Sequence, residues 1–369
     1  MKLLYVFPEP LPLPRARGGQ VANTVRALAQ TGIDVVLAHS PGETDPFAGV
    51  GLERPPGVRL LPVSRSLPWP LEHLHSNRVF VRRLRPMIEQ ERPDAVFARH
   101  LKPVCAIRKL FPDLPLVYEA HEVFADTAVP SKRAAIGRLE RDAIQAATLV
   151  IANSRATSAR LQALYEPGCE IVVIPNGVVR PAAMPRKDWP RIAGAIVYAG
   201  SLFPWKGVAE LVQAAGFLPG CTVTIAGGDA AEIAQLRAKV DPNGARIEFA
   251  GRLPGDAVRT LLERCCVGVL PNRADADSAF TSPIKLFEYM AAGCAVVASD
   301  LPALHEILAD DEAVWVRPGD PASLASGIRL LVEESSRART LGLRLYEKSA
   351  QFTWDARAAR LADALRRVA

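Results

Sequence analysis

The sequence predicts an α/β protein with two parallel, doubly wound sheets. Short runs rich in Val, Ile and Leu alternate with amphipathic segments along the chain. These apolar runs are largely continuous, which is typical of strands buried on both faces of a parallel sheet. The alternation also extends over too many segments for one sheet, and residues 179–191 interrupt it with three prolines. Alternating strands and helices of this kind favour two Rossmann-like domains.

The first half of the chain is expected to form one domain, residues 1–178. The strands expected in it are 2–7, 34–39, 58–63, 95–99, 116–120, 149–152 and 171–175. The helices expected between them include 20–30, 134–147 and 155–164.

The second half is expected to form another domain, residues 192–353, after a linker at 179–191. Its expected strands are 195–199, 222–226, 246–250, 267–270, 295–298 and 313–316, and its expected helices include 208–215, 230–239 and 256–264. A last helix, about 355–369, follows the final strand and could pack back on the first domain.

Composition excludes several classes of protein. With 49% hydrophobic and 23% charged residues the chain is too apolar for general disorder. No stretch approaches the roughly 18 apolar residues of a membrane span, and the apolar run 3–7 is too short for a signal-peptide core. The six cysteines form no CxxC pair, so we expect reduced thiols in a cytoplasmic protein.

Net positive charge is concentrated in the first half, where 22 Lys and Arg residues are balanced by only 17 Asp and Glu residues. Within it, the segment 65–85 interleaves arginines with apolar side chains. These residues are Arg65, Arg78, Arg82, Arg83 and Arg85, with Trp69, Leu71, Leu74, Val79 and Phe80. Two interpretations stay open: a solvated basic helix with an apolar stripe facing the core, or peripheral contact with the anionic inner face of a membrane. Nucleic-acid binding is not expected, because an aromatic platform and a dense basic stripe are missing.

Polar residues follow several of the expected strands. In parallel α/β sheets ligands bind beyond the carboxyl ends of the strands. Gly, Asn and Ser also suit any turn, but His100 and His121 follow two different strands and favour a function. Asn153 follows a third strand and is a weaker candidate.

The strongest local pattern is 281–293 (TSPIKLFEYMAAG). Ser282 suits the N-cap of a helix and Pro283 its first position. The free amides near Ile284 and Lys285 would form an anion site. Glu288, on the next turn, could accept hydrogen bonds from the ribose of a nucleotide. A well-capped helix with a solvated glutamate explains the pattern equally well.

In each domain, one glycine-containing segment follows the first strand. Residues 200–207 (GSLFPWKG) carry Lys206, and residues 15–20 (RARGGQ) carry Gly18 and Gly19. Each could bring backbone close to a ligand or be a surface turn. A dinucleotide fingerprint, a Walker A motif and a serine-hydrolase elbow are all missing. A D-x-D pattern ends at Asp277, but so short a match is weak, and we expect no metal site.

Several short motifs, taken in the order in which they occur along the chain, resemble those of the retaining glycosyltransferases of family 4, which have the GT-B fold. The most specific is SPIKLFEYMAAGCAVVASD at 282–300; the others are RGGQ, VYEAHE, VIANS, VIPNGV, YAGSLFPWKGV and IEFAGRL. The resemblance implies two facing Rossmann-like domains. The second would bind a nucleotide sugar and the first mainly the acceptor, with no cofactor.

The resemblance also implies roles for individual residues. Glu288 would hold the ribose, and His121 would lie beside the transferred sugar. Lys206 and the backbone at Ser282, Pro283, Ile284 and Lys285 would bind the diphosphate, and Gly18 and Gly19 would form a loop closing over it. The backbone around Arg252 and Leu253 would flank the base. Lysines and helix amides would neutralise the leaving diphosphate without a metal.

Two departures from the family pattern bear on the donor. The first position of the family's E-x(7)-E is Phe280 here, so Asp277, Ser278 or the amides from Phe280 to Ser282 would contact the sugar hydroxyls. Ser201 stands where the family often has an arginine, which leaves more of the charge to Lys206 and to Lys285 or Arg252.

The resemblance implies a retaining hexosyltransferase that uses a nucleoside diphosphate sugar. Its acceptor would be a hydroxyl of a saccharide or a lipid-linked molecule, in cell-surface polysaccharide or glycoconjugate synthesis. Two alternatives remain: a GT-B sugar-nucleotide epimerase, and a non-catalytic saccharide-binding or scaffold protein derived from a transferase.

Overall fold

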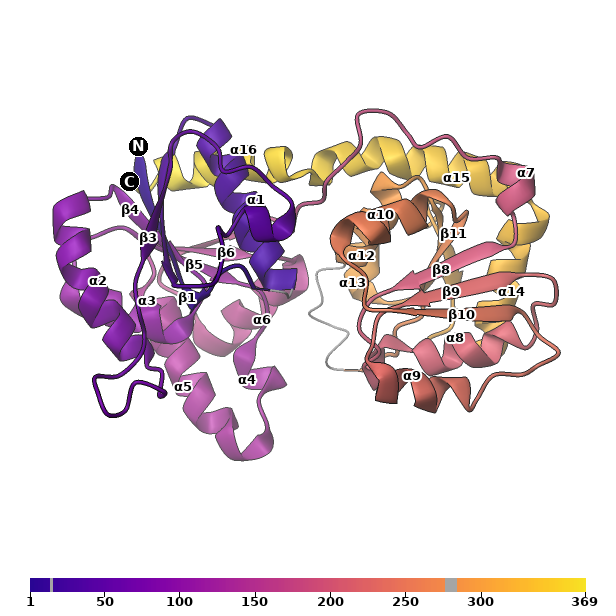
Figure 1. The fold of residues 1–369 in the computed structure, drawn as a ribbon, viewed down its shortest axis with the longest axis horizontal. Coiled ribbons are helices and arrows are strands. Elements are labelled where there is room, and N and C mark those ends of the chain that lie inside the picture. The colour runs from indigo at the N-terminus through magenta and orange to yellow at the C-terminus, as the bar shows by residue number, and fades with distance from the viewer. Residues whose placement is uncertain (14–15, 276–283) are drawn as a thin grey trace. The chain divides into compact units, whose positions relative to one another are not determined.

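The computed structural model describes residues 1–13, 16–275 and 284–369. The chain divides into two compact units (Figure 1). Unit 1 consists of Met1–Gly177 and Trp354–Ala369, and unit 2 of Val178–Thr353. No helix in the described part of the chain is long and apolar enough to cross a membrane.

Unit 1 is built on a seven-stranded parallel sheet in the order β3-β2-β1-β4-β5-β6-β7. The strands are β1 (Lys2–Pro10), β2 (Asp34–Ser40), β3 (Val58–Pro62), β4 (Ala95–Ala98), β5 (Leu116–Ala120), β6 (Leu149–Ala152) and β7 (Glu170–Val173). Every strand predicted for this half forms, with small differences at the ends. The six middle residues of β1 are all buried, which explains the continuous apolar runs in the sequence.

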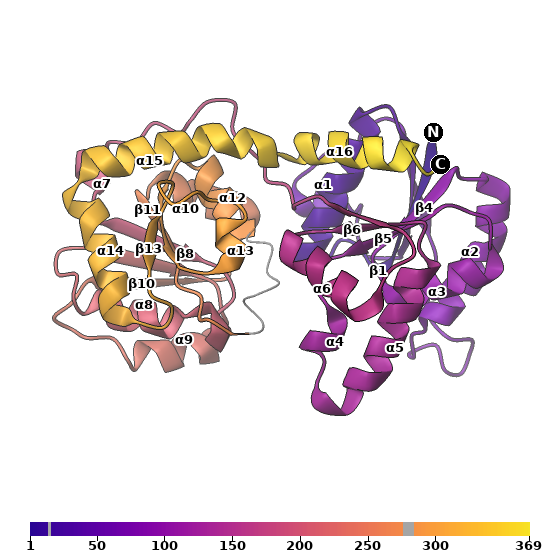
Figure 2. The ribbon, with the colours of Figure 1, turned by 180° about the vertical axis from the view of Figure 1, so that it is seen from behind.

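Helices cover both faces of this sheet (Figure 2). They are α1 (Ala16–Gln30), α2 (Asn77–Glu91), α3 (Leu101–Leu110), α4 (Phe124–Thr127), α5 (Pro130–Ala146), α6 (Arg155–Tyr165) and α16 (Trp354–Arg366), with a 3-10 turn, η1 (Ala48–Val50). The C-terminal helix α16 packs against α1 on one face, and α2, α3 and α5 lie on the other.

Unit 2 is built on a six-stranded parallel sheet in the order β10-β9-β8-β11-β12-β13. The strands are β8 (Ala195–Ala199), β9 (Thr222–Ala226), β10 (Arg246–Gly251), β11 (Val267–Leu270), β12 (Ala295–Ser299) and β13 (Val314–Val316). They match the six predicted strands closely.

The helices of unit 2 also form two layers. They are α7 (Trp189–Ile192), α8 (Val208–Ala215), α9 (Ala230–Arg237), α10 (Gly255–Glu263), α12 (Ile284–Ala291), α13 (Pro302–His305), α14 (Pro321–Glu333) and α15 (Ser335–Lys348), with 3-10 turns η2 (Pro204–Lys206) and η3 (Ser349–Phe352). One apolar core joins α8 and α14 to the sheet. The other joins α10, α12 and α15 to its opposite face.

The segment 179–191, expected to be a linker, packs within unit 2. Trp189 is buried in the core of that unit. The ammonium group of Lys187 donates a hydrogen bond of 3.0 Å to the carbonyl of Leu262. The prolines of this segment therefore indicate irregular backbone, and side-chain contacts hold the segment against the rest of unit 2.

The basic segment 65–85 is not one helix. Residues 65–76 form a loop that an isolated bridge between Ser66 and His75 closes, and α2 begins only at Asn77. Within α2, Phe80 is fully buried, as the helical interpretation expects. In the loop, however, Trp69 is 81% exposed and Leu71 and Leu74 are also exposed. The apolar stripe facing the core is thus confirmed for α2, and membrane contact through the exposed loop stays a prediction.

Candidate active site

The strand order of each sheet predicts where a ligand would bind. In unit 2 the chain proceeds outward from β8 through β9 to β10, and then returns to the other side of β8 with β11. Ligands of parallel α/β sheets bind at the carboxyl ends of strands where the order reverses in this way. The segments that follow β8 and β11 carry Lys206 on one side and Lys285 and Glu288 on the other.

The loops after β8 and β11 are tied together. Gly207, which ends η2, has a φ of +68°, and a Cβ there would lie 1.8 Å from the carbonyl oxygen of Pro271. The amide of Arg273 donates a hydrogen bond of 2.9 Å to the carbonyl of Trp205. Close backbone contact therefore requires glycine at position 207 and fixes Lys206 next to the β11 loop.

Lys206 is a cation in an unfavourable place. Its ammonium group lies 3.8 Å from the centre of the Trp205 ring. Burial and, secondly, the positive charge of Lys285 lower the pKa of Lys206 to about 8. Two lysines from separate elements are thus close enough to repel each other, an arrangement that an anion between them would relieve.

Helix α12 supplies the other side of this site. Lys285 Nζ lies 2.8 Å from Glu288 Oε2, one turn along the helix, and both side chains are partly exposed. The first amides of α12, from Ile284 onward, have no partner within their own helix. Ser282, Pro283, Asp277, Ser278 and Phe280 lie outside the described residues, so their predicted roles stay predictions.

Ser201, Arg252 and Leu253 follow β8 and β10 at the same edge of the sheet. Ser201 and Arg252 are exposed, and the carbonyl of Ser201 accepts a hydrogen bond of 2.6 Å from the Tyr198 hydroxyl. Leu253 is partly buried and packs against the core that includes α10 and α12. The side chains of Ser201 and Arg252 are therefore accessible to a ligand, and the predicted contact of the backbone at 252–253 with the base stays a prediction.

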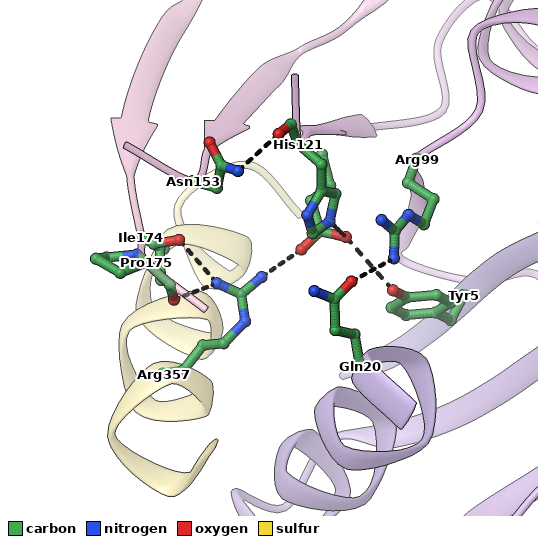
Figure 3. A network of polar contacts seen from close by, with 9 residues as sticks. Tyr5, Gln20, Arg99, His121, Asn153, Ile174, Pro175 and Arg357 are labelled. Atoms are coloured by element: carbon green, nitrogen blue, oxygen red, sulfur yellow. Dashed lines mark hydrogen bonds and ion pairs between the residues drawn. The ribbon is translucent and has the colours of Figure 1, made fainter. Parts of the chain in front are cut away.

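In unit 1, His121 follows β5 and is held through its backbone and its ring (Figure 3). Asn153, which follows β6, donates a hydrogen bond of 2.7 Å to the carbonyl oxygen of His121. The ring atom Nε2 lies 2.9 Å from Glu119 Oε2. Burial and the nearby Arg99 lower the pKa of His121 to about 4, so its imidazole is neutral at pH 7.

Glu119 was missed as a candidate, although it is a carboxylate in the apolar strand β5. It is 4% exposed, and its Oε1 accepts a short hydrogen bond from Arg357 of α16. Burial alone would raise the pKa of Glu119, but the contact with His121 and the charge of Arg357 outweigh it and hold that pKa below its usual range. A single acidic residue in an otherwise apolar strand was the sequence signal for this candidate, because a buried carboxylate needs a partner.

His100 lies at the reversal point of the unit 1 sheet, between β1 and β4. Its Nε2 is 3.0 Å from Glu9 Oε1, and Arg17 Nη2 is 2.5 Å from Glu9 Oε2. Burial would raise the pKa of Glu9, but hydrogen bonds from His100 and Arg17 lower it to about 2. This ion-paired cluster also includes two residues, Glu9 and Arg17, that had not been proposed for the site.

Gly18 and Gly19 belong to the first turn of α1, which begins at Ala16 and not at Gln20 as expected. A Cβ at position 18 would lie 2.4 Å from the carbonyl oxygen of Leu13, whereas the space beside Gly19 is open. The expected loop is therefore a helix N-terminus, in which Gly18 permits a close backbone contact.

In the described ranges no group of three or more His, Cys, Asp or Glu side chains is arranged to hold a metal ion.

Comparison with known sequences identifies both units. Residues 19–180 match the profile of "Glycosyltransferase Family 4", and residues 193–334 match that of "Glycosyl transferases group 1". A phosphatidyl-myo-inositol mannosyltransferase of Mycobacterium tuberculosis is 32% identical over 179 residues, which cover 45% of this chain and 46% of that protein. A D-inositol 3-phosphate glycosyltransferase of Nocardioides sp. is 26% identical over 293 residues, covering 69% of this chain and 62% of that protein. The match to the mannosyltransferase thus spans about half the length of each protein.

Solved structures resemble the whole chain. Sucrose-phosphate synthase from Thermosynechococcus elongatus has a TM-score of 0.77 at 19% identity and covers 99% of this chain and 98% of that one. Anabaena HepE in complex with UDP has a TM-score of 0.73 at 19% identity, with 99% and 100% covered. At these identities the likeness establishes the fold, which is GT-B. With one glycosyltransferase profile matching each unit and this fold across both, the chain belongs to the glycosyltransferases of family 4.

Proposed function

We propose that the protein transfers a hexosyl group from a nucleoside diphosphate sugar to a hydroxyl acceptor, with retention of configuration and without a metal ion. The observation that carries the proposal is the convergence of Lys206 and Lys285 beside Glu288, where the strand order of unit 2 reverses. Two cations and a set of helix amides suit a diphosphate, and a neighbouring carboxylate suits ribose hydroxyls. The HepE structures with UDP and with UDP-glucose support a donor of this class.

The proposed chemistry follows from these groups. The bond between the sugar C1 and the diphosphate oxygen breaks, and a bond from C1 to the acceptor oxygen forms on the same face. The acceptor proton passes to an oxygen of the leaving diphosphate. Lys206, Lys285 and the first amides of α12 stabilise the negative charge that develops on that leaving group. Glu288 would give up its contact with Lys285 as Lys285 turns to the phosphate.

The edge of unit 1 is proposed to serve the sugar and the acceptor. His121 is neutral at pH 7 and fixed by Asn153 and Glu119, so it can form a directed hydrogen bond with a sugar hydroxyl. The polar cluster of His100, Glu9 and Arg17 at the reversal point is the proposed place for the acceptor.

We further propose that the acceptor is linked to lipid and that the protein works at the cytoplasmic face of a membrane, in the synthesis of a cell-surface glycoconjugate. The relative named as a phosphatidyl-myo-inositol mannosyltransferase supports a lipid acceptor. The exposed Trp69, Leu71 and Leu74 beside the arginines of α2 support contact with an anionic lipid surface.

The donor proposal is tested by thermal unfolding with UDP, GDP, ADP and TDP and their common sugars, with and without Mg²⁺. A ligand at 100 times its dissociation constant adds roughly 2.7 kcal/mol of stability, which for a protein of this size raises Tm by a few degrees. We expect one nucleotide to raise Tm equally with and without Mg²⁺. Glu288→Ala should abolish the rise, and Glu333→Ala, at an exposed position in α14, should keep it.

Other outcomes would favour the other functions. No rise in Tm with any nucleotide would favour a non-catalytic scaffold. Conversion of the bound nucleotide sugar to its epimer in the absence of an acceptor would favour an epimerase.

A further inference from the structure

We propose that Glu119 and Arg357 are positioning residues that fix the proton of the His121 ring on Nε2 and so leave Nδ1 to accept a hydrogen bond from a sugar hydroxyl. The proposal rests on the proposed role of His121 beside the transferred sugar. It adds a residue from the C-terminal helix, Arg357, to the residues on which sugar contact depends.

The surroundings of His121 Nε2 argue for the position of the proton. This atom is buried, has no well-aligned hydrogen-bond partner among the described residues, and lies 2.9 Å from Glu119 Oε2, its nearest acceptor in an ion pair. An ionised carboxylate can only accept hydrogen bonds. The neutral ring must therefore carry its hydrogen on Nε2, because a lone pair turned toward a carboxylate at this distance would be repelled. The other ring nitrogen, Nδ1, is then an acceptor.

Arg357 decides how Glu119 is oriented. Its guanidinium group is 2% exposed and pairs with Glu119 Oε1. It also donates hydrogen bonds of 2.8 and 2.7 Å to the carbonyl oxygens of Ile174 and Pro175 (Figure 3). These three acceptors hold the planar guanidinium group of Arg357 in place. Because that group in turn holds Glu119 Oε1, the carboxylate of Glu119 keeps its orientation, and its Oε2 stays directed at the His121 ring.

Other charged and titratable groups near the ring agree with this assignment. Arg99 follows β4 and contacts Gln20 of α1, with 3.2 Å between Arg99 Nη1 and Gln20 Oε1. Its positive charge, together with burial, disfavours a second proton on His121. Tyr5 of β1 is 3.5 Å from Glu119 Oε2 and is a weak second donor to the same oxygen. Glu119 is thus the group that determines which ring nitrogen is protonated.

The test is the tautomer of His121, measured by long-range ¹H–¹⁵N NMR on the full chain with ¹⁵N-labelled histidine at pH 7. The resonance is assigned by its loss in His121→Gln. In the wild type we expect the proton on Nε2. In Glu119→Gln, Arg357 still requires an oxygen, so the amide must turn its NH₂ group toward His121. We therefore expect the proton to move to Nδ1.

Two further variants separate this effect from general damage. Tyr5→Phe removes the weaker donor and leaves both ion-pair partners, so it should keep the Nε2–H tautomer. The double variant Glu119→Gln, Arg357→Met frees the amide to rotate, and the proton should return to Nε2. A wild-type ring protonated on Nδ1, or a Glu119→Gln variant with an unchanged tautomer, would overturn the proposal.

Function is a separate arm of the experiment. Nucleoside diphosphate affinity should be unchanged in Glu119→Gln, because those contacts belong to unit 2, while the turnover number for sugar release should fall at least tenfold. If the ring proton of His121 moves to Nδ1 in Glu119→Gln and the turnover number stays unchanged, the proposed role of the tautomer in sugar contact would be overturned. The tautomer is measured on the ligand-free chain, so its result does not depend on the transferase proposal. Failure of the transferase proposal would be seen separately, because the wild type would then bind no nucleotide.

Discussion

Lys206 is the residue whose charge state should control donor binding. Its pKa is lowered to about 8 by burial and by Lys285, so it is mostly protonated below pH 8 and loses its proton above. A diphosphate binds the protonated form more tightly. Affinity for the nucleotide identified by thermal unfolding should therefore fall as pH rises through about 8, approaching tenfold per pH unit when one proton is linked to binding.

Calorimetric titrations between pH 7.5 and 9.5 would test this dependence. Lys206→Arg is the matched control, since a guanidinium group stays charged throughout that range. It should bind with an affinity that changes little with pH. In the wild type, binding near pH 8.5 should take up protons, seen as an enthalpy that depends on the ionisation heat of the buffer. Equal slopes for the two proteins would exclude Lys206 as the titrating group.

At the residue scale, local patterns in the sequence pointed to some residues of the candidate site and missed others. Lys206, Lys285 and Glu288 stand beside glycine and helix-start signals, so short windows of sequence pointed to them. Glu119 could not be connected to its partner in this way, because Arg357 lies 238 residues away and the contact depends on the return of α16 to unit 1. Pairs formed across a fold leave no local pattern for sequence reasoning to use.

At the element scale, the tie between the loops after β8 and β11 should be sensitive to one methyl group. Gly207→Ala would place a Cβ 1.8 Å from the Pro271 carbonyl oxygen, at a φ of +68°. We expect a loss of more than ~3 kcal/mol of stability in unit 2, together with weaker nucleotide binding. Tm and calorimetric titration would measure the two effects.

Gly220→Ala is the control for that substitution. Its φ of +80° imposes similar backbone strain, but no atom lies within 4 Å of the added Cβ. The cost should be about 1 kcal/mol, with nucleotide affinity unchanged. Similar losses at both positions would mean that backbone strain alone, without the contact to Pro271, determines the effect.

The elements themselves were predictable to different degrees. Strands were predicted well because burial on both faces gives continuous apolar runs. The start of α1 was predicted too late, because Gly18 and Gly19 are poor helix formers and the close contact of Gly18 with Leu13 involves a separate segment. The segment 65–85 was treated as a unit because charge alternates with apolar residues throughout, yet the closing contact of Ser66 with His75 ends the loop before α2 begins.

At the scale of the whole molecule, charge is unevenly distributed. The first 178 residues carry 22 of the 45 basic residues but only 17 of the 39 acidic ones. Within them, Arg78 and Arg82 of α2 are exposed and pair with no carboxylate among the described residues. Arg85, by contrast, is paired with Glu89. These two exposed arginines follow the exposed apolar residues of the loop within a short stretch of the chain.

This arrangement predicts salt-sensitive binding to anionic vesicles. The protein should co-sediment with vesicles containing phosphatidylglycerol but not with pure phosphatidylcholine, and rising salt should release it. Each basic residue near the surface contributes about 1 kcal/mol. Arg78→Gln with Arg82→Gln should therefore weaken binding roughly thirtyfold. Trp69→Ala should weaken it also at high salt, since its contribution is apolar.

The control keeps the net charge of the double variant and moves the change to unit 2. Lys239→Gln with Arg259→Gln removes two exposed cations from that unit. If position on the surface matters, this variant should bind vesicles like the wild type. If net charge alone draws the protein to the membrane, both double variants should lose affinity equally, and the loop 65–76 would then have no specific part in lipid contact.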